Sequence, residues 1–393
     1  ARGETRPDGT PERILGTVQD VTEARRAERE HRIAATLQRS LLPERLPEIP
    51  GVELSARYVP ATEESDVGGD WYDVVELPSG RIALAVGDVA GHGLRAASVM
   101  AQLRMALRAY AVEESGPADV IERVHRLFQR VSLSDMATVV YLVFDVESGE
   151  VRFANAGHPP PLVIRRDGST EYVGGALAPP LGAMPHAGRF FEGRASLSDG
   201  DTLLLFTDGL VERRGTALDE GLDRLAREAA SARGGLETLC ETLLTTLVGE
   251  GVADDVAMLA VRPVTLAERP FEIRIAAEPH VLATIRRAVR RWLRAVDASE
   301  EDAYEVLAAL GEACTNVIQH AYGAARGRLE LRFDRADGDI EVMVRDFGTW
   351  RGESRGDGGR GLVLMRGLMD AVSIERDAAG TTVTMRRRLR RRS

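Results

Sequence analysis

Aspartate stands at the edges of apolar segments four times between residues 67 and 256 of this 393-residue chain. Each of these aspartates lies beside glycine or a second aspartate, in the segments 67–73, 86–93, 206–209 and 253–256. Carboxylates that converge without a basic residue repel one another, and a hard divalent cation neutralises that repulsion. One Asp-Gly pair is more typical of a turn than of a metal site. Four in one region weaken the turn interpretation, although spacing alone leaves both open.

The identity of the cation follows from the side chains that are missing. No histidine and cysteine residues cluster with the spacing of a zinc site, so oxygen-preferring Mg²⁺ or Mn²⁺ is expected. The region also lacks the Cys-x5-Arg loop of cysteine phosphatases, since Thr245 and Thr246 follow Cys240 where the arginine would stand. His92 and His158 lie in turns rich in glycine and proline, where we expect them to brace the backbone rather than to act as acids.

The apolar segments have the length and composition of strands. Strands are predicted over 82–86, 139–144, 151–155, 202–206 and 256–261, and helices over 94–113, 118–131, 222–233 and 236–248. Since strands outnumber helices, an α+β layered sandwich fits residues 52–263 best. The aspartate segments fall at the ends of these strands or in the adjoining turns.

Five motifs occur in a fixed order in this region: GGDWYD, GDVAGHG, NAGHPP, FTDGLVE and DDVAML. The set resembles the metal-dependent type 2C protein phosphatases, with the closest likeness to the bacterial SpoIIE/RsbU branch, over nearly all of residues 40–262. The resemblance implies two central β-sheets flanked by helices, with two Mn²⁺ or Mg²⁺ ions at one end. By motif, the ligands would be Asp70, Asp88 as the bridge, the carbonyl of Val89, Asp208, Asp254 and, as a companion position, Asp255.

The implied chemistry is hydrolysis of a phosphoserine or phosphothreonine. Two divalent ions lower the pKa of a shared water and stabilise both oxygens of an in-line displacement. No protein nucleophile is needed for such a reaction, so Asp70, Asp88, Asp208 and Asp254 would be catalytic through the metals that they hold.

A second group of polar residues lies near the C-terminus. Glu312, Asn316 and His320 recur every four residues on one face of a helix predicted over 299–320, among small apolar residues. Further on, Asp346 and Gly348 follow a strand predicted over 340–346, and a Gly-Gly-Arg-Gly run opens a helix predicted over 361–369. The start of a helix is a favourable place for phosphate. Other predicted elements here are strand 271–276, helix 279–296, strand 328–333 and two final strands.

These motifs resemble the GHKL ATP-binding fold, specifically the serine/threonine kinases of the RsbW and SpoIIAB type that act as anti-sigma factors, over about residues 270–390. The resemblance makes Glu312 the candidate general base and Asn316 the residue that holds Mg²⁺ on the phosphates of ATP. Asp346 would read the adenine amino group, and the remaining nucleotide-binding positions would be Gly348, Gly359, Gly361, Leu362 and Thr382. Trp350 stands where the family often has a second glycine, which leaves kinase turnover more open than ATP binding.

The N-terminal residues "DGTPERILGTVQDVTE" resemble the last strands of a PAS sensor domain, with a strand predicted over 14–21. An amphipathic helix without glycine or proline is predicted next, because Ile33, Leu37 and Leu41 recur at spacing four. The predicted organisation is a PAS remnant at 1–22, a dimerising linker helix at 23–42, the phosphatase domain at 43–263 and the GHKL domain at 264–393. The whole is α+β and multidomain, a type 2C β-sandwich flanked by helices followed by a GHKL α/β sandwich.

Charge is distributed unevenly along the chain. The net charge of −10 divides into −14 for residues 43–263 and +3 for residues 264–393. The acidic balance argues against a nucleic-acid partner, and six arginines within residues 386–392 are interpreted as a solvated chain end. Because 44% of the residues are hydrophobic, the sequence excludes a wholly disordered chain. Because no apolar run is long enough to span a bilayer and the two cysteines lie far apart, a cytoplasmic protein is expected.

The combined motifs predict a phosphatase linked to a kinase-like module in a partner-switching pathway of sigma factor control. The expected substrate is a phosphorylated anti-sigma factor antagonist of the STAS type, and a sigma factor is a possible further partner. In the alternative interpretation, the C-terminal domain is a non-catalytic module that senses nucleotide or binds sigma factor and regulates the phosphatase. A third interpretation, an inactive phosphatase scaffold, conflicts with the complete set of predicted metal ligands.

Overall fold

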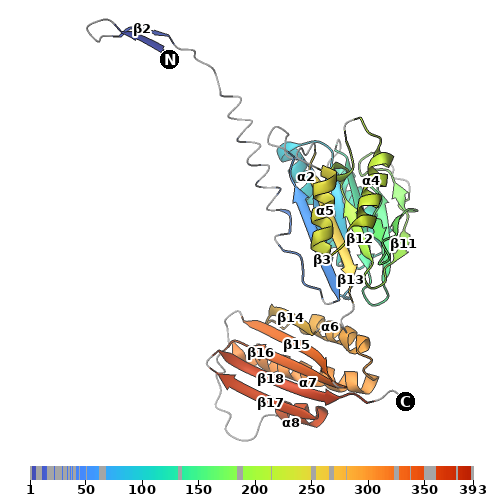
Figure 1. The fold of residues 1–393 in the computed structure, drawn as a ribbon, viewed down its shortest axis with the longest axis vertical. Helices are drawn as coiled ribbons and strands as arrows, with labels where there is room; N and C mark the ends of the chain where they lie inside the picture. Colours follow the sequence, from blue (N-terminus) through green and yellow to red (C-terminus); the bar gives the residue numbers. More distant parts are fainter. Residues whose placement is uncertain are drawn as a thin grey trace.

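The structure is a computed structural model. It describes the chain except for residues 1, 6–10, 16–21, 23–28, 30–32, 34–35, 37, 39–40, 44, 50, 62–67, 132–134, 184–188, 214, 249–253, 265–269, 280, 323–326, 337, 349–359, 378 and 391–393. Figure 1 shows two folded units in succession along the chain. We call the unit built from β3 to β13 the middle domain and the unit built from β14 to β18 the C-terminal domain.

The middle domain is a sandwich of two mostly antiparallel sheets. The first has the order β10-β7-β6-β5-β4, with β11 paired to β7, and the second has the order β3-β13-β12-β8-β9. The strands of the first sheet are β4 (Trp71–Glu76), β5 (Ile82–Val89), β6 (Ala137–Phe144), β7 (Glu150–Ala156), β10 (Leu177–Ala178) and β11 (Gly193–Ser196). The strands of the second are β3 (Val52–Val59), β8 (Leu162–Ile164), β9 (Thr170–Tyr172), β12 (Thr202–Phe206) and β13 (Val256–Pro263).

Helices cover the outer faces of this sandwich. Helix α2 (Gly93–Ala111) contacts β5, and α3 (Pro117–Val131) contacts β6 and β7. On the other side α4 (Leu218–Ser231) contacts β8 and β9, and α5 (Leu236–Val248) contacts β3 and β13 (Figure 1). Strands β5, β6 and β13 consist almost entirely of buried residues because both of their faces are covered. The predicted α+β sandwich flanked by helices is confirmed.

The strand register brings the aspartate segments to one end of the sandwich. Strands β4 and β5 pair antiparallel from Trp71 opposite Gly87 to Glu76 opposite Ile82, so the start of β4 and the end of β5 lie together. Strands β12 and β13 pair with Phe206 opposite Met258, which places the end of β12 beside the start of β13. Residues just outside these four strand ends therefore share one edge.

The C-terminal domain is a five-stranded antiparallel sheet of order β14-β15-β16-β18-β17, packed against helices (Figure 1). Its strands are β14 (Phe271–Ala276), β15 (Arg328–Ala336), β16 (Asp339–Asp346), β17 (Ala371–Asp377) and β18 (Gly380–Arg388). Its helices are α6 (Val281–Ala295), α7 (Glu300–Asn316), a π-helical turn (Val317–Ala321) and α8 (Arg360–Leu368). Alternating residues of β16 are buried against the helices. The α/β sandwich expected here is confirmed.

The two domains meet through arginines of α6. Arg287 donates to the carbonyl of Pro78 at 2.9 Å and pairs with Glu76 at 3.3 Å, at the tip of the β4–β5 hairpin. Arg294 pairs with Glu147 at 3.0 Å, in the turn between β6 and β7. Basic residues of one domain thus contact acidic hairpin ends of the other.

The ends of the chain bear on two expectations. Strand β2 (Pro11–Leu15) pairs antiparallel with β1 (Arg2–Thr5) and includes residues 14 and 15 of the strand predicted over 14–21, whose remaining residues lie outside the described part of the chain. The expectation of a solvated arginine-rich end is wrong for one residue. The arginine-rich end is not wholly solvated, because Arg387 is 8% exposed and pairs with the buried Asp302 and with Glu305.

Of the helix predicted over residues 23–42, the structure describes only some positions. Thr22, Arg29, Ile33, Thr36, Gln38 and Leu41 are helical, and Leu37 lies outside the described residues. Among the described helices, none combines the length and the apolar character needed to cross a bilayer.

Candidate functional site

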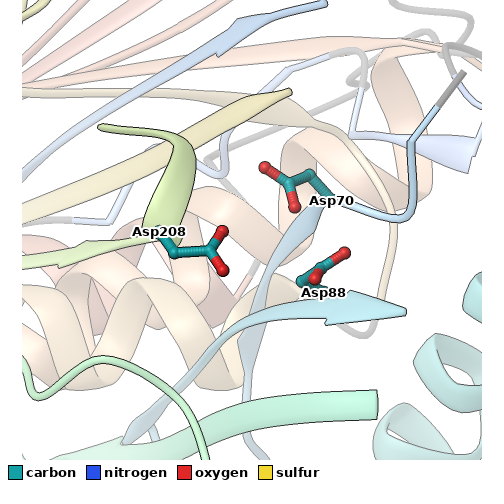
Figure 2. Close-up of side chains that lie close together, drawn as sticks. All are labelled: Asp70, Asp88 and Asp208. Carbon is teal, nitrogen blue, oxygen red and sulfur yellow. The ribbon is translucent and has the colours of Figure 1, made fainter. Parts of the chain in front are cut away.

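Three of the predicted metal ligands converge at the shared edge of the sandwich. Carboxylate oxygens of Asp70, Asp88 and Asp208 lie within 4.8 Å of one another. Figure 2 shows the three side chains grouped together, each coming from a different segment. Asp70 immediately precedes β4, Asp88 is the penultimate residue of β5, and Asp208 opens the 3-10 turn η1 (Asp208–Leu210) after β12.

The cluster is electrostatically unfavourable without a cation. Burial raises the pKa of Asp70 well above its usual value, and the neighbouring Asp88 carboxylate adds to the shift. Burial also raises the pKa of Asp88, to about 7, with Asp208 and Asp254 as the next causes. The pKa of Asp208 is raised by burial and then by Glu212. Within the described part of the chain, no arginine forms an ion pair with these three carboxylates. Asp70 is buried and Asp88 and Asp208 are half-buried, and mutually repelling oxygen ligands in such surroundings fit a hard divalent ion.

The close approach of two loops beside the cluster depends on glycine. A Cβ atom on Gly69 would lie 2.2 Å from the carbonyl oxygen of Val89, and the Val89 amide donates to the carbonyl of Gly69 at 3.3 Å. The backbone of Val89, which the motif resemblance makes a ligand, therefore lies against the loop that carries Asp70. Only glycine permits this spacing.

The two aspartates before β13 have different surroundings. Asp254 is exposed, and its Oδ1 accepts a 2.8 Å hydrogen bond from the amide of Asp255. Although part of Asp254 contacts solvent, partial desolvation of its carboxylate raises the pKa of Asp254, and the negative charge of Asp208 adds to the shift, so Asp254 lies within electrostatic range of the cluster. Asp255 is 1% exposed, and its carboxylate accepts hydrogen bonds from the Ala61 amide at 2.8 Å, from the Tyr58 hydroxyl and from Gln38. Both of its oxygens are therefore engaged by the protein.

Three supporting residues lie outside the interpretation from sequence. Thr207 is fully buried, and its hydroxyl donates to Oδ2 of Asp70 at 2.6 Å while accepting from the Ala257 amide at 2.8 Å. Tyr58 and Gln38 contact Asp255, as described above. Thr207 precedes Asp208 in the FTDGLVE motif, and this position beside a predicted ligand was the only feature of the sequence that could have indicated its supporting role. The contacts of Tyr58 and Gln38 join residues that lie 197 and 217 positions apart.

His158 braces a turn, as predicted. Its backbone amide donates to Oδ1 of Asn155 at 2.8 Å, and the Asn155 side chain donates back to the His158 carbonyl at 2.8 Å. Its ring Nδ1 lies 2.8 Å from the Thr138 hydroxyl. Burial lowers the pKa of His158 to about 3, so the ring is neutral at physiological pH. His92 lies at the start of α2 and is exposed.

The candidate nucleotide site is built from α7, α8 and the β16–β18 pair. A Cβ atom on Gly361 would lie 2.0 Å from Oε1 of Glu312, so the start of α8 rests directly on that carboxylate. Glu312 also lines a cavity of 260 Å³ between α6 and α7. Asn316 is the last residue of α7, and His320 follows in the π-helical turn and is exposed.

Asp346 ends β16 as a buried side chain. It is 1% exposed, and its Oδ1 accepts from the amide of Gly348 at 3.0 Å. In the adjoining strand β18, Thr381 pairs with Asp346, and Thr382 pairs with Arg345. Leu362 lies in α8 and is half-buried. The predicted site residue Gly359 lies outside the described residues, as does Trp350, which stands where the family often has a second glycine.

The comparisons with known proteins agree with both halves of this geometry. The family model described as "Stage II sporulation protein E (SpoIIE)" matches residues 78–264, and the one described as "Histidine kinase-like ATPase domain" matches residues 275–387. The first match includes Asp88, Asp208 and Asp254 and begins after Asp70. The fold and the site thus define a type 2C-like phosphatase domain followed by a GHKL-like ATPase domain.

Individual relatives repeat this two-domain arrangement or one half of it. The crystal structure of the RsbU and RsbW domains of Rv1364c from Mycobacterium tuberculosis is 34% identical, with a TM-score of 0.54 over 87% of this chain and 94% of that chain. The serine-protein kinase RsbW of Bacillus licheniformis is 32% identical over 31% of this chain and 86% of the relative. The phosphoserine phosphatase RsbU of Bacillus subtilis is 29% identical over 46% of this chain and 53% of the relative.

The chain belongs to the family of regulators that join an RsbU/SpoIIE-type phosphatase domain to an RsbW-type histidine-kinase-like ATPase domain. It spans 38% of the length of the curated phosphatase RsbP and 53% of that of RsbU.

Proposed function

We propose that this protein is a metal-dependent phosphatase that removes phosphate from the phosphoserine or phosphothreonine of an anti-sigma factor antagonist of the STAS type. The observation that carries the proposal is the convergence of Asp70, Asp88 and Asp208 within 4.8 Å at one edge of the sandwich, where Asp70 is buried and the other two are half-buried. Two relatives of this chain, RsbP and RsbU, are named phosphoserine phosphatases, which supports a phosphorylated serine as the substrate group.

In this mechanism the side chains of the cluster would hold two Mn²⁺ or Mg²⁺ ions, which would supply an activated water for in-line attack on phosphorus. Carboxylate oxygens of Asp70, Asp88 and Asp208 lie within 4.8 Å of one another, so all three residues would act as ligands, and the motif resemblance gives Asp88 the role of the shared ligand. Asp254, the Val89 carbonyl and the companion residue Asp255 are the further proposed ligands. Thr207 fixes the orientation of Asp70 through its hydroxyl, so the ligand does not have to be ordered when the metal binds.

For the C-terminal domain we infer ATP binding with Mg²⁺ on Asn316 and the adenine on Asp346, with Gly348, Gly359, Gly361, Leu362 and Thr382 around the nucleotide. Glu312 would then act as general base in phosphorylation of the antagonist. The contact between Gly361 and Glu312 supports this reading, because it places the start of a helix, where phosphate binds well, beside the proposed base. The second candidate function is a non-catalytic domain that senses nucleotide or binds sigma factor.

The setting we propose is a bacterial partner-switching pathway in the cytoplasm. The partners would be the phosphorylated antagonist and a sigma factor. Two copies of the chain would dimerise through the linker segment at residues 23–42, which would follow PAS-like residues 1–22. The domain boundaries at residues 43–263 and 264–393 belong to the same proposal.

The phosphatase proposal is tested by phosphate release from a phosphorylated antagonist in the presence and absence of Mn²⁺. We expect Mn²⁺-dependent release from the wild-type protein and its loss in Asp88→Asn. Asp219→Asn is the matched control, because Asp219 is an exposed carboxylate in the first turn of α4. Release that persists in Asp88→Asn, or that needs no metal, contradicts the proposal.

The kinase function is tested with radiolabelled ATP, Mg²⁺ and the unphosphorylated antagonist in an Asp70→Ala background that suppresses dephosphorylation. Label on the antagonist that disappears in Glu312→Gln supports a kinase. ATP binding without label supports the non-catalytic alternative instead.

A further inference from the structure

A glutamine of the linker segment reaches the metal-ligand loops of the sandwich. Gln38 is helical and 2% exposed. Its side-chain Nε2 faces three acceptors: Oδ2 of Asp255 at 2.9 Å, the carbonyl of Gly68 at 3.1 Å and the carbonyl of Asp70 at 3.5 Å. One of these carbonyls belongs to a residue of the three-aspartate cluster.

Asp255 connects this amide to the rest of the site. Besides Gln38, its carboxylate accepts from the Tyr58 hydroxyl at the end of β3 and from the Ala61 amide at 2.8 Å. A Cβ atom on Gly68 would lie 2.8 Å from Cγ of Asp255, so the loop before Asp70 is seated directly on this carboxylate. The Asp255 amide in turn donates to Asp254 at 2.8 Å. Four separate segments thus meet in one buried polar network.

The position of Gln38 is fixed by apolar packing on its C-terminal side. Leu42 and Ile49 are buried in the same core as the strands of the sandwich, at 9% and 5% exposure, and Leu41 and Leu46 pack against that core. On its N-terminal side, Ile33 and Thr36 are exposed. Gln38 is therefore the first described residue of the linker segment that is buried in the middle domain.

The chemistry of the contact is that of a donor, which an apolar side chain of the same size cannot replace. A primary amide donates two hydrogens, and here they are directed at one carboxylate and at the backbone of the loop that carries Asp70. Loss of the donors would remove one of the three hydrogen bonds to the buried Asp255 carboxylate, leaving those from Tyr58 and Ala61, and would also remove the bond to the Gly68 carbonyl. Removing a partner from a buried polar group costs more free energy than a typical hydrogen bond contributes. The loop would then lose the contact that sets its position relative to Asp255.

We propose that Gln38 is a positioning residue for the metal site, which sets metal affinity by fixing the Gly68–Asp70 loop against Asp255. The inference rests on the proposed function only in that Asp70, Asp88 and Asp208 bind the metal. Gln38 does not touch a carboxylate of the cluster, so its effect is transmitted through the Asp70 backbone and through Asp255.

The test compares two variants of similar size. Gln38→Met keeps the length and burial of the side chain but removes both donors, and Gln38→Glu replaces the donors by a carboxylate next to Asp255. Mn²⁺ affinity is measured by isothermal titration calorimetry on the full chain, and folding by near-ultraviolet circular dichroism and thermal unfolding without metal. The matched control is Gln102→Ala, since Gln102 is an exposed glutamine of α2.

Supporting residues of metal ligands change metal affinity by about 10- to 100-fold when they are removed. We expect a decrease of that size in Gln38→Met, a larger one in Gln38→Glu, and none in Gln102→Ala. Because a positioning residue acts on metal binding, phosphate release by Gln38→Met should approach the wild-type kcat at saturating Mn²⁺. The variant should differ only in needing a higher Mn²⁺ concentration to reach that rate.

The inference is overturned if folded Gln38→Met and Gln38→Glu bind Mn²⁺ within twofold of the wild-type affinity. It is also overturned if Gln38→Met does not unfold cooperatively, since the residue would then maintain the fold as a whole. A wild-type protein that binds Mn²⁺ but releases no phosphate contradicts the proposed function and leaves the affinity comparison valid. A wild-type protein that binds no Mn²⁺ contradicts both.

Discussion

The hydroxyl of Thr207 lies 2.6 Å from Oδ2 of Asp70, although the two residues are 137 positions apart in the chain. The same hydroxyl accepts from the Ala257 amide at 2.8 Å. One buried threonine therefore connects β12, β13 and the loop before β4, three of the four elements that carry or adjoin the proposed ligands, the fourth being β5 with Asp88. A metal site assembled from separate strands needs such a connection, because no single strand holds two of its carboxylates in place.

We expect Thr207→Val to lower Mn²⁺ affinity by about 10- to 100-fold, since valine keeps the shape of threonine but cannot donate to Asp70. Thr207→Ser retains the hydroxyl and should stay close to the wild-type affinity. Calorimetric titration with Mn²⁺ measures both variants. The exposed Thr216 supplies the control variant Thr216→Val, and equal affinities in Thr207→Val and Thr216→Val would contradict the assigned role.

The raised pKa values make a prediction about pH. Burial and neighbouring carboxylates raise the pKa of Asp88 from 3.8 to about 7, and they raise that of Asp70 as well. Between pH 3.8 and about pH 7, the folded, metal-free protein therefore binds more protons than the unfolded chain. For this reason the contribution of these groups to the free energy of unfolding decreases as the pH rises through that range. Metal ions replace the protons, so apparent Mn²⁺ affinity should rise over pH 6 to 8.

Proton release provides the measurement. Titrations with Mn²⁺ near pH 6.5, in buffers of different ionisation enthalpy, should show protons leaving the protein as the metal binds. Asp88→Asn removes the carboxyl that titrates near pH 7, so less proton release is expected from it. An Mn²⁺ affinity that does not change between pH 6 and pH 8 in the wild-type protein would rule out this coupling.

The sequence predicted the parts of the fold and of the site that are encoded locally. Asp70, Asp88 and Asp208 stand in short motifs beside glycine, and the strands that carry them are continuous apolar runs, so both features can be read without the structure. Strands β8 to β11 are two to four residues long. Such short segments have too little periodicity to be distinguished from loops, and only their neighbours in the sheet define them.

Contacts between distant segments account for what was missed. Tyr58 and Gln38 have no special residue type or spacing, and they gain a role only because Asp255 lies beside them in the folded chain. Arg387 is similar: within a run of arginines it looks like a solvated charge, but its partner Asp302 is 85 positions earlier. A charge pattern along the sequence does not reveal which of its members is buried.

For the nucleotide site, we expect Gly361→Ala to weaken ATP binding. The added Cβ would approach Oε1 of Glu312 to 2.0 Å and its Cγ to 2.8 Å, so the whole side chain would have to move. A tenfold loss of affinity corresponds to about 1.4 kcal/mol, and we expect at least that. Gly367→Ala in the same helix is the control, because its Cβ would have nothing within 4 Å. Fluorescence titration with labelled ATP distinguishes them, and matching affinities would refute the site.

The buried ion network at the C-terminal end predicts a large loss of stability. Asp302 is fully buried, and although burial alone would raise its pKa, hydrogen bonds from Ser299, the Arg390 amide and Arg387 hold that pKa below its usual value. Arg387 also pairs with Glu305 and donates to the Leu368 carbonyl at 3.1 Å, which connects α7 to the end of α8. Arg387→Ala removes the nearer and more buried of the two arginines that pair with Asp302, at 3.3 Å, and leaves only Arg390 at 3.9 Å. Breaking a buried ion pair by removing one partner typically costs about 3–5 kcal/mol.

We therefore expect urea unfolding of the C-terminal domain to shift to lower concentration in Arg387→Ala, with no change in the phosphatase's Mn²⁺ affinity. The adjacent Arg388→Ala is the matched control, because Arg388 is exposed and only its backbone amide bonds to Asp370. Since the pKa of Asp302 is lowered, the contribution of this network should be present at neutral pH and decline as the pH falls below about 4. If Arg387→Ala and Arg388→Ala unfold at the same urea concentration, the arginine-rich end is a solvated tail after all, and the contact between α7 and β18 must be maintained by apolar packing alone.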